Sequence, residues 1–195
     1  IFTNLSHDHL DYHKNMTSYF NAKMYLFKKL ISKDSKIITD EDINEFNPIK
    51  KIAKRRGIKK ITIGSKSGNI IILNCKYKNN KQIIKIAIKK KIIMLEVPLI
   101  GSFQVKNLLM AILAAHQCGI SYNRLFSQIT NIKSVTGRLE QIVRLKNNSN
   151  IVVDFAHTPE ALENSLNALK NQFQIKILLV FGCGGDRDRK KRLIM

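Results

Sequence analysis

Two short apolar segments, each ending in a polar or glycine-rich loop, constrain the fold of this chain most strongly. Residues 151–155 (IVVDF) and 176–181 (KILLVF) have the composition of buried strands. Thr158 and Pro159 open a predicted helix between them, with the proline where its missing N–H leaves no helical hydrogen bond unmade. The second segment ends in residues 182–185 (GCGG). The order strand, helix, strand and glycine-rich loop predicts a βαβ unit with a parallel sheet.

The rest of the chain alternates between helical and strand-like periodicity. Apolar residues recur at a 3.6-residue period over residues 16–31, a pattern typical of an amphipathic helix. Further helices are predicted at residues 42–56, 105–118 and 121–132. The first of these is the weakest, because Pro48 interrupts it. Apolar runs between turn signals predict four strands, at residues 60–64, 69–74, 82–88 and 92–98.

These elements divide the chain into two α/β parts. The helical pattern breaks at residues 135–137 (VTG), and we expect a hinge at residues 136–140. We therefore predict the later part of one α/β domain at residues 1–135 and the start of a Rossmann-like second domain at residues 136–195. Because the first residue is Ile1 and not methionine, we interpret the chain as a piece whose beginning lies elsewhere.

Several classes of protein are disfavoured by composition. The longest apolar runs, such as residues 70–73 (IIIL), are far shorter than the roughly 18 residues of a membrane span, and no secretory signal is recognisable. The three cysteines (Cys75, Cys118 and Cys183) are an odd number without C-x-x-C spacing. This pattern argues against a disulfide framework and a zinc site, and it predicts a reducing, cytoplasmic location.

The chain is strongly basic, with 34 Lys and Arg against 14 Asp and Glu and a net charge of +20. Residues 50–91 contain fifteen of these basic residues and no acidic one. One interpretation is a polyanion site, which keeps a nucleic-acid-binding module as an alternative. The other is a solvated basic face enlarged by coding bias, because Ile, Lys and Asn make up 73 of the 195 residues. Lys also outnumbers Arg by 26 to 8, whereas nucleic-acid readout favours Arg.

A histidine-rich segment is the first candidate for chemistry. Residues 4–13 (NLSHDHLDYH) contain three imidazoles and two carboxylates. One interpretation is a zinc hydrolase that uses His7, His9 and His13, although the spacing of the last histidine is one residue too long for the metallo-β-lactamase pattern. A second interpretation is a hard-cation site in which one histidine and phosphate oxygens hold Mg²⁺. A polar loop with capping carboxylates is the structural alternative.

Lys23 lies within the apolar stripe of the predicted helix 16–31. Its neighbours three and four positions away are aromatic or aliphatic: Tyr19, Phe20, Leu26 and Phe27. A charged ammonium is costly to bury there, so the side chain either snorkels to solvent or is neutralised. Carbamylation would turn it into a carboxylate-like anion that suits Mg²⁺.

Two polar segments follow the predicted strands of the βαβ unit. Residues 154–159 (DFAHTP) lead from a strand into a helix, and residues 182–189 (GCGGDRDR) combine free backbone N–H groups with arginines. Because ligands of open α/β sheets bind at the carboxyl ends of strands, both are candidate binding loops, the second for an anion. A helix cap and a glycine-rich turn with solvated charges are the structural alternatives.

Six stretches together resemble the Mur ligase family, specifically the branch that adds the third residue of the peptidoglycan peptide. They occur in family order, at residues 3–13 (TNLSHDHLDYH), 19–27 (YFNAKMYLF), 100–113 (IGSFQVKNLLMAIL), 137–140 (GRLE), 152–162 (VVDFAHTPEAL) and 180–192 (VFGCGGDRDRKKR). The sequence departs from the family pattern at His7, Gln104, Lys190 and Leu193. It contains no G-x-x-x-x-G-K-[ST] phosphate loop.

The resemblance assigns a role to each of seven residues. It implies that His9 and carbamylated Lys23 hold Mg²⁺, Asn107 lies near the adenine, Arg138 near the ATP phosphates and Asp154 at the ribose, His157 lines the nucleotide pocket, and Arg187 contacts the incoming amino acid. It also implies that residues 1–135 are the later part of the central ATP-binding domain and that residues 136–195 begin the amino-acid-binding domain.

The activity implied by the resemblance is ATP-dependent amide formation in peptidoglycan synthesis, the pathway on which cell shape and division depend. The γ-phosphoryl group passes to a carboxylate of the UDP-N-acetylmuramoyl dipeptide, and an amine of the third residue, expected to be meso-diaminopimelate, attacks the acyl phosphate. Phosphoryl transfer depends on positioning and charge neutralisation, which fits these residue types. We expect a monomer with ATP and Mg²⁺ as cofactors and no specific nucleic acid. Without a phosphate loop, the isolated piece is expected to be inactive.

Overall fold

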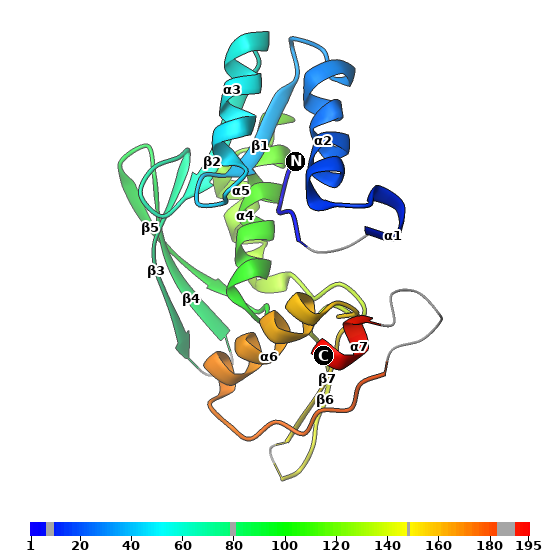
Figure 1. Ribbon diagram of the computed structural model, residues 1–195. Coiled ribbons are helices and arrows are strands. Elements are labelled where there is room, and N and C mark those ends of the chain that lie inside the picture. Colours follow the sequence, from blue (N-terminus) through cyan, green and yellow to red (C-terminus); the bar gives the residue numbers. More distant parts are fainter. Residues whose placement is uncertain (7–9, 79–80, 148, 183–189) are drawn as a thin grey trace.

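A computed structural model describes residues 1–6, 10–78, 81–147, 149–182 and 190–195 (Figure 1). In the first half of the chain the elements are α1 (Leu10–His13), α2 (Met16–Tyr25), the π-helical turn η1 (Leu26–Leu30), β1 (Lys36–Asp40), α3 (Phe46–Arg56), β2 (Lys59–Gly64), β3 (Ile70–Lys78), β4 (Lys81–Ile88) and β5 (Lys91–Val97). They are followed by α4 (Ser102–Gln117), α5 (Tyr122–Ser127), the 3₁₀ turn η2 (Ile129–Asn131), β6 (Glu140–Arg144), β7 (Asn150–Val153), α6 (Pro159–Phe173) and α7 (Lys190–Ile194). In the described part of the chain, no helix is long and apolar enough to span a bilayer.

The larger sheet is mixed and has the strand order β1-β2-β3-β4-β5. β1 pairs with β2 and β2 with β3 in parallel, whereas β3, β4 and β5 form an antiparallel meander. β3 and β5 stand away from the helices, on the left in Figure 1. The chain is therefore α/β, as the sequence predicts.

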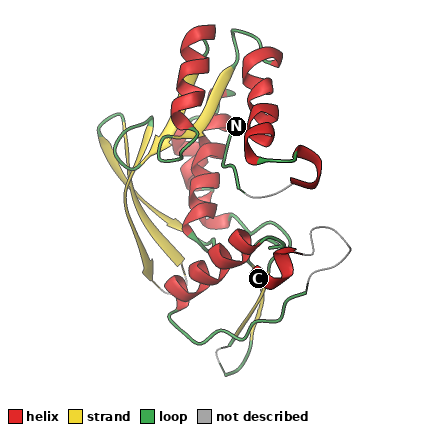
Figure 2. Cartoon of the chain, viewed as in Figure 1, coloured by secondary structure: helices red, strands yellow, loops and turns green. Residues whose placement is uncertain are grey.

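The alternation of side chains along β1 explains the helix layers. Ile37 faces the first hydrophobic cluster, which is built with Met24, Phe27, Ile49 and other residues of α2, η1 and α3. Ile38 points to the opposite face and joins a second cluster with the α4 residues. Helices thus cover both faces of the parallel part of the sheet, as Figure 2 shows.

α4 forms the centre of the second cluster. Val105, Leu109, Met110, Ile112 and Leu113 are buried on this helix and pack against the inner face of the sheet. Their spacing of three and four residues produces the apolar stripe that the sequence predicts, although the helix begins three residues earlier than expected, at Ser102.

The second part of the chain is a small antiparallel pair, β6–β7, next to α6. Thr158 caps α6 through a hydrogen bond from Ala161 N–H, and Pro159 occupies the first turn, as predicted. A buried cluster of Ile100, Leu139 and Ala168 joins this part to the end of the larger sheet.

One predicted strand is wrong. Residues 176–181 do not form a strand, and the chain there is exposed, with Leu178 93% and Val180 90% accessible. The β7 strand pairs antiparallel with β6, and the described residues contain no parallel partner for it. An apolar run becomes a strand only where a neighbour completes its hydrogen-bond ladder. The predicted βαβ unit is therefore absent from the described structure.

Three further differences concern local structure. The predicted helix 16–31 ends in the π-helical turn η1, where Ile31 N–H bonds to Leu26 C=O. α3 starts at Phe46, so Pro48 lies in its first turn and does not interrupt it. Strands β1 and β6 are not among the sequence-predicted elements, because each is a short run adjacent to charged residues.

Candidate functional site

The predicted hinge is a tight turn that joins the two parts of the chain. Gly137 has a φ of +68° and its N–H bonds to the Glu140 carboxylate at 2.7 Å, while Arg138 N–H bonds to Val135 C=O at 2.9 Å. Leu139 is fully buried and adopts a φ of +43°, a left-handed conformation that is unfavourable for leucine. The surrounding contacts therefore hold the turn in one shape.

Asp154 connects this hinge to both neighbouring elements. It follows β7 directly, and its Oδ1 accepts a hydrogen bond from Leu139 N–H at 3.0 Å. Its Oδ2 accepts one from the hydroxyl of Ser165 on α6 at 2.6 Å. Both carboxylate oxygens thus accept hydrogen bonds from the chain itself. Asp154 therefore connects the predicted hinge and the end of β7 to α6. The resemblance assigns it to the ribose, which remains a prediction.

Arg138 and His157 lie against one exposed aromatic ring, that of Phe155, which directly follows Asp154 in the chain. The Arg138 guanidinium carbon lies 4.9 Å from the centre of the Phe155 ring, a cation–π distance. The His157 ring meets the Phe155 ring edge-on at 5.2 Å between centroids, and His157 Nδ1 lies 3.1 Å from Phe155 C=O. The structure thus brings together three of the seven predicted site residues, at the carboxyl end of β7.

α4 contributes a second contact to the hinge. The Gln104 amide donates to Arg138 C=O at 3.1 Å. Asn107, the predicted adenine neighbour, is exposed three residues further along α4. In addition, Gly101 N–H donates to the buried Gln172 side chain of α6 at 3.2 Å. The start of α4 therefore holds the second part of the chain in place.

An ion pair that sequence reasoning missed lies at the carboxyl end of β1. The Asp40 carboxylate is buried, accepts from Asp42 N–H at 2.9 Å, and pairs with Lys106 Nζ of α4 at 2.6 Å. Asp42 lies 3.8 Å from the same ammonium. The signal in the sequence is a β-branched run, residues 37–39 (IIT), followed at once by three acidic residues. Phe155, Ser165 and Gln104 are likewise missed, because their roles depend on tertiary contacts.

Lys23 lies on α2 and is only partly buried. Its Nζ is 3.4 Å from Asn4 C=O, 4.8 Å from the centre of the Tyr19 ring and 5.8 Å from that of Phe2. The lysine therefore reaches across to the first residue of the histidine-rich segment. His9 and Arg187, two further predicted site residues, lie outside the described residues.

The described residues offer only an incomplete site for a metal ion. Among them no group of three or more His, Cys, Asp and Glu side chains lies together. His13, which is described, stacks on Tyr19 at 5.0 Å between centroids. An ammonium cannot bind a cation, whereas a carbamate oxygen beside a backbone carbonyl has the oxygen chemistry that Mg²⁺ prefers. The donor set at Lys23 and Asn4 therefore fits Mg²⁺ only with a carbamylated lysine. Nothing in the described residues supports the zinc-hydrolase alternative, and two of its three histidines, His7 and His9, lie outside them.

Fold and site together define a class of α/β protein. A tight turn connects a part with a mixed sheet to a second, smaller part, and an arginine, a carboxylate and an imidazole lie beside that turn. Residues 1–115 match the Mur ligase middle domain, and residues 137–195 match the Mur ligase, glutamate ligase domain. The chain belongs to the Mur ligase family.

Similar proteins cover this chain from end to end. A curated relative from Rickettsia rickettsii, named UDP-N-acetylmuramoyl-L-alanyl-D-glutamate–2,6-diaminopimelate ligase, is 40% identical over 197 residues, which include 100% of this chain and 40% of the relative. A solved structure of a ligase with the same name has a TM-score of 0.73 at 32% identity and covers 98% of this chain and 39% of its own. MurF from Acinetobacter baumannii has a TM-score of 0.73 at 16% identity, covering 87% of this chain and 36% of its own, which shows the shared fold. The chain thus spans about two fifths of the length of the relatives it matches.

Proposed function

We propose that this chain is part of an ATP-dependent ligase that joins 2,6-diaminopimelate to UDP-N-acetylmuramoyl-L-alanyl-D-glutamate in peptidoglycan synthesis. The observation that carries the proposal is the gathering of Arg138, Asp154 and His157 beside a rigid hinge, in a chain that aligns over its whole length with ligases of that name. A nucleic-acid-binding module explains neither the hinge nor this alignment.

The proposed reaction needs charge neutralisation more than covalent help from the protein. The backbone of Arg138 is held by hydrogen bonds to Val135 and Gln104, and its guanidinium lies over the Phe155 ring. Because the arginine is already held in place, binding a phosphate costs it little further conformational entropy. We assign the phosphates to Arg138, the ribose side to Asp154, the pocket wall to His157 and the adenine side to Asn107.

Mg²⁺ belongs to the same proposal. When bound, it would neutralise phosphate charge, and carbamylated Lys23 together with His9 would hold it. The Lys23 amine lies 3.4 Å from Asn4 C=O, so a carbamate on this side chain would set its oxygens beside the start of the histidine-rich segment. We also propose a domain boundary after residue 135 and contact between Arg187 and the incoming amino acid.

The experiment uses the complete ligase that carries this sequence, with each substrate varied in turn. Lys23→Arg should lower turnover at least about tenfold, because a guanidinium stays positive where the site needs an anion. Lys28→Arg is the matched control, since Lys28 is exposed on the adjoining turn η1 and its only described bond is a long one to Asn21 at 3.5 Å. Turnover of this control should be unchanged.

Two results would count against the proposal in different ways. Near-normal turnover of Lys23→Arg would show that Lys23 merely snorkels, while leaving the reaction class intact. A wild-type protein that forms no amide from diaminopimelate, with ATP and the UDP-linked dipeptide present, would refute the proposed function itself. Lysine in place of diaminopimelate tests the choice of third residue.

A further inference from the structure

The outer face of the β3–β5 meander is uncovered in the described structure. The inner face packs on α4 through residues such as Ile84, Ile86 and Leu95. On the opposite face, α2, η1 and α3 cover β1 and β2. Over β3–β5 that same face instead exposes large apolar side chains: Leu73 at 46%, Ile92 at 60% and Met94 at 59%.

The register shows that these side chains form one group. On the outer face, Ile71 pairs with Ala87 and Ala87 with Ile92. The next outer row pairs Lys85 with Met94, and Leu73 lies at the irregularity of β3 beside these two rows. We call Ile71, Leu73, Ala87, Ile92 and Met94 the meander patch.

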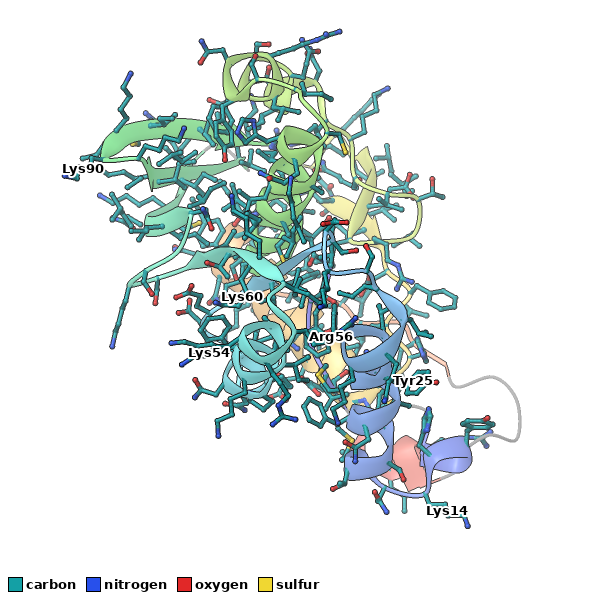
Figure 3. The ribbon with its side chains drawn as sticks, turned by 90° about the horizontal axis from the view of Figure 1, so that it is seen from above. Lys14, Tyr25, Lys54, Arg56, Lys60 and Lys90 are labelled. Atoms are coloured by element: carbon teal, nitrogen blue, oxygen red, sulfur yellow. The ribbon has the colours of Figure 1, made fainter. Side chains whose placement is uncertain are left out.

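Lysines stand on both sides of the meander patch. Towards the far end of the strands the outer face carries four, namely Lys76, Lys78, Lys81 and Lys85. At the near end, the turn between β4 and β5 is Lys89-Lys90, whereas Lys91 pairs with the buried Ile88 and so points to the inner face. The one acidic residue within β3–β5, Glu96, already pairs with Lys81. Figure 3 shows Lys90 at the outer tip of the strands, away from the body of the molecule.

The lysine turn has an unusual backbone. Lys89 and Lys90 have φ values of +47° and +67°, the left-handed conformation that two-residue hairpin turns require and that Asn and Gly adopt most easily. Lysine does not favour this left-handed conformation, so the local turn geometry does not explain why two lysines occupy these positions. It does place two ammonium groups, those of Lys89 and Lys90, next to the meander patch.

The combination of apolar side chains and lysines on the outer face of the meander favours one kind of binding partner. A second copy would set like charges against each other, which is unfavourable. Nucleic-acid surfaces rely on Arg and on aromatic rings for stacking, and the outer face of the meander carries neither. An anionic bilayer offers phosphate and carboxylate headgroups for the lysines and an apolar layer for Ile92, Met94 and Leu73.

We propose that the meander patch and its flanking lysines dock this protein on the anionic surface of a lipid bilayer. The contact is peripheral: ammonium groups bind headgroups while the exposed aliphatic side chains enter the boundary between headgroups and acyl chains. It lies on β3–β5 and does not depend on the ligase reaction proposed above.

The test is sedimentation of the purified protein with vesicles of phosphatidylcholine, with and without about one third phosphatidylserine. We expect binding to the anionic vesicles alone, weakened as salt rises. Lys89→Glu/Lys90→Glu should weaken binding at least about tenfold, since each lysine near a charged surface contributes several-fold. Ile92→Ser/Met94→Ser should also weaken it, by roughly tenfold, without changing the charge.

Matched controls lie on the second part of the chain. Lys170→Glu/Lys176→Glu changes the net charge equally at exposed positions away from the meander, and Leu178→Ser removes an aliphatic side chain that is more exposed than Ile92 or Met94. Both should bind as the wild type does. Circular dichroism checks that every variant is folded.

Four outcomes would overturn the proposal. Equal weakening by the Lys170/Lys176 control would show a general effect of net charge. Unchanged binding of Ile92→Ser/Met94→Ser would show that the apolar patch takes no part. Binding of single-stranded RNA without binding of vesicles would assign the face to nucleic acid. Self-association in sedimentation velocity that the Lys89/Lys90 variant abolishes would assign it to a second copy.

Discussion

The two parts of this chain differ in how far their apolar residues are buried. In the first part, sixteen described residues form one continuous buried cluster between the sheet and α4. In the second part, Leu139 and Ala168 form a small buried cluster only together with Ile100 of the first part, while Phe155, Leu178 and Val180 are exposed. Similar apolar runs therefore became core in one part and surface in the other. The difference shows that burial depends on having a layer on each face, not on the run itself.

The strongest test of this contrast compares two leucines. Leu109→Ala should lower the free energy of unfolding by about 2–5 kcal/mol, because the residue is fully buried in α4 and truncation leaves a cavity. Leu178→Ala should change it by less than about 0.5 kcal/mol, since that side chain is 93% exposed. Urea unfolding followed by circular dichroism measures both. A large loss for Leu178→Ala would mean that residues 176–181 are packed in solution and that the contrast is wrong.

A second comparison concerns a buried and an exposed ion pair among the described residues of the first part. Lys106→Met should destabilise the protein by about 1–3 kcal/mol, because it leaves the buried Asp40 carboxylate without its cation. Lys81→Met should cost at most about 1 kcal/mol, since Lys81 and Glu96 are both well exposed. Thermal unfolding of the two variants side by side gives the difference. Equal effects would contradict the view that burial, and not pairing, sets the cost.

A third comparison tests whether polar contacts stabilise the second part in place of a large core. Ser165→Ala removes the hydroxyl that donates to Asp154 and should cost about 1–2 kcal/mol, since the bond reaches a charged acceptor. Ser127→Ala is the control: its hydroxyl donates to Arg124 C=O on an exposed turn, and its loss should change stability by less than about 0.5 kcal/mol. Denaturant midpoints decide this. A neutral Ser165→Ala would show that Asp154 does not clamp α6 to the hinge.

The smallest expected effect concerns thiol reactivity within the first part. Burial raises the pKa of the Cys75 thiol, whereas Cys118 is exposed at the end of α4. Because the thiolate is the reactive form, Cys75 should be alkylated more slowly than Cys118 at pH 8, and its rate should keep rising at higher pH. Iodoacetamide labelling followed by peptide mapping resolves each cysteine. Faster labelling of Cys75 would mean that the inner face of β3 opens in solution.

Local patterns in the sequence were sufficient for most elements. The apolar stripe of α4, the Thr158-Pro159 start of α6 and the four strands from residue 59 to 97 all appear close to where periodicity predicts them. These features depend on side chains within a few residues of one another, so one sequence can report them. The turn at Gly137 and the segment of residues 154–159 between β7 and α6 also lie where the sequence places them, while their roles as domain hinge and binding loop stay predictions.

The sequence by itself determined the class of fold, the order of its elements and the residue types at the candidate site. Only the tertiary structure decided which apolar runs are buried, since residues 176–181 lack a strand partner while β1 gains two helix layers. It also decided that both oxygens of Asp154 serve Leu139 and Ser165, and that Asp40 meets Lys106 across 66 positions of the chain. The physical reason is that a hydrogen bond or an ion pair between distant residues exists only once packing has brought them together, and no local period records that distance.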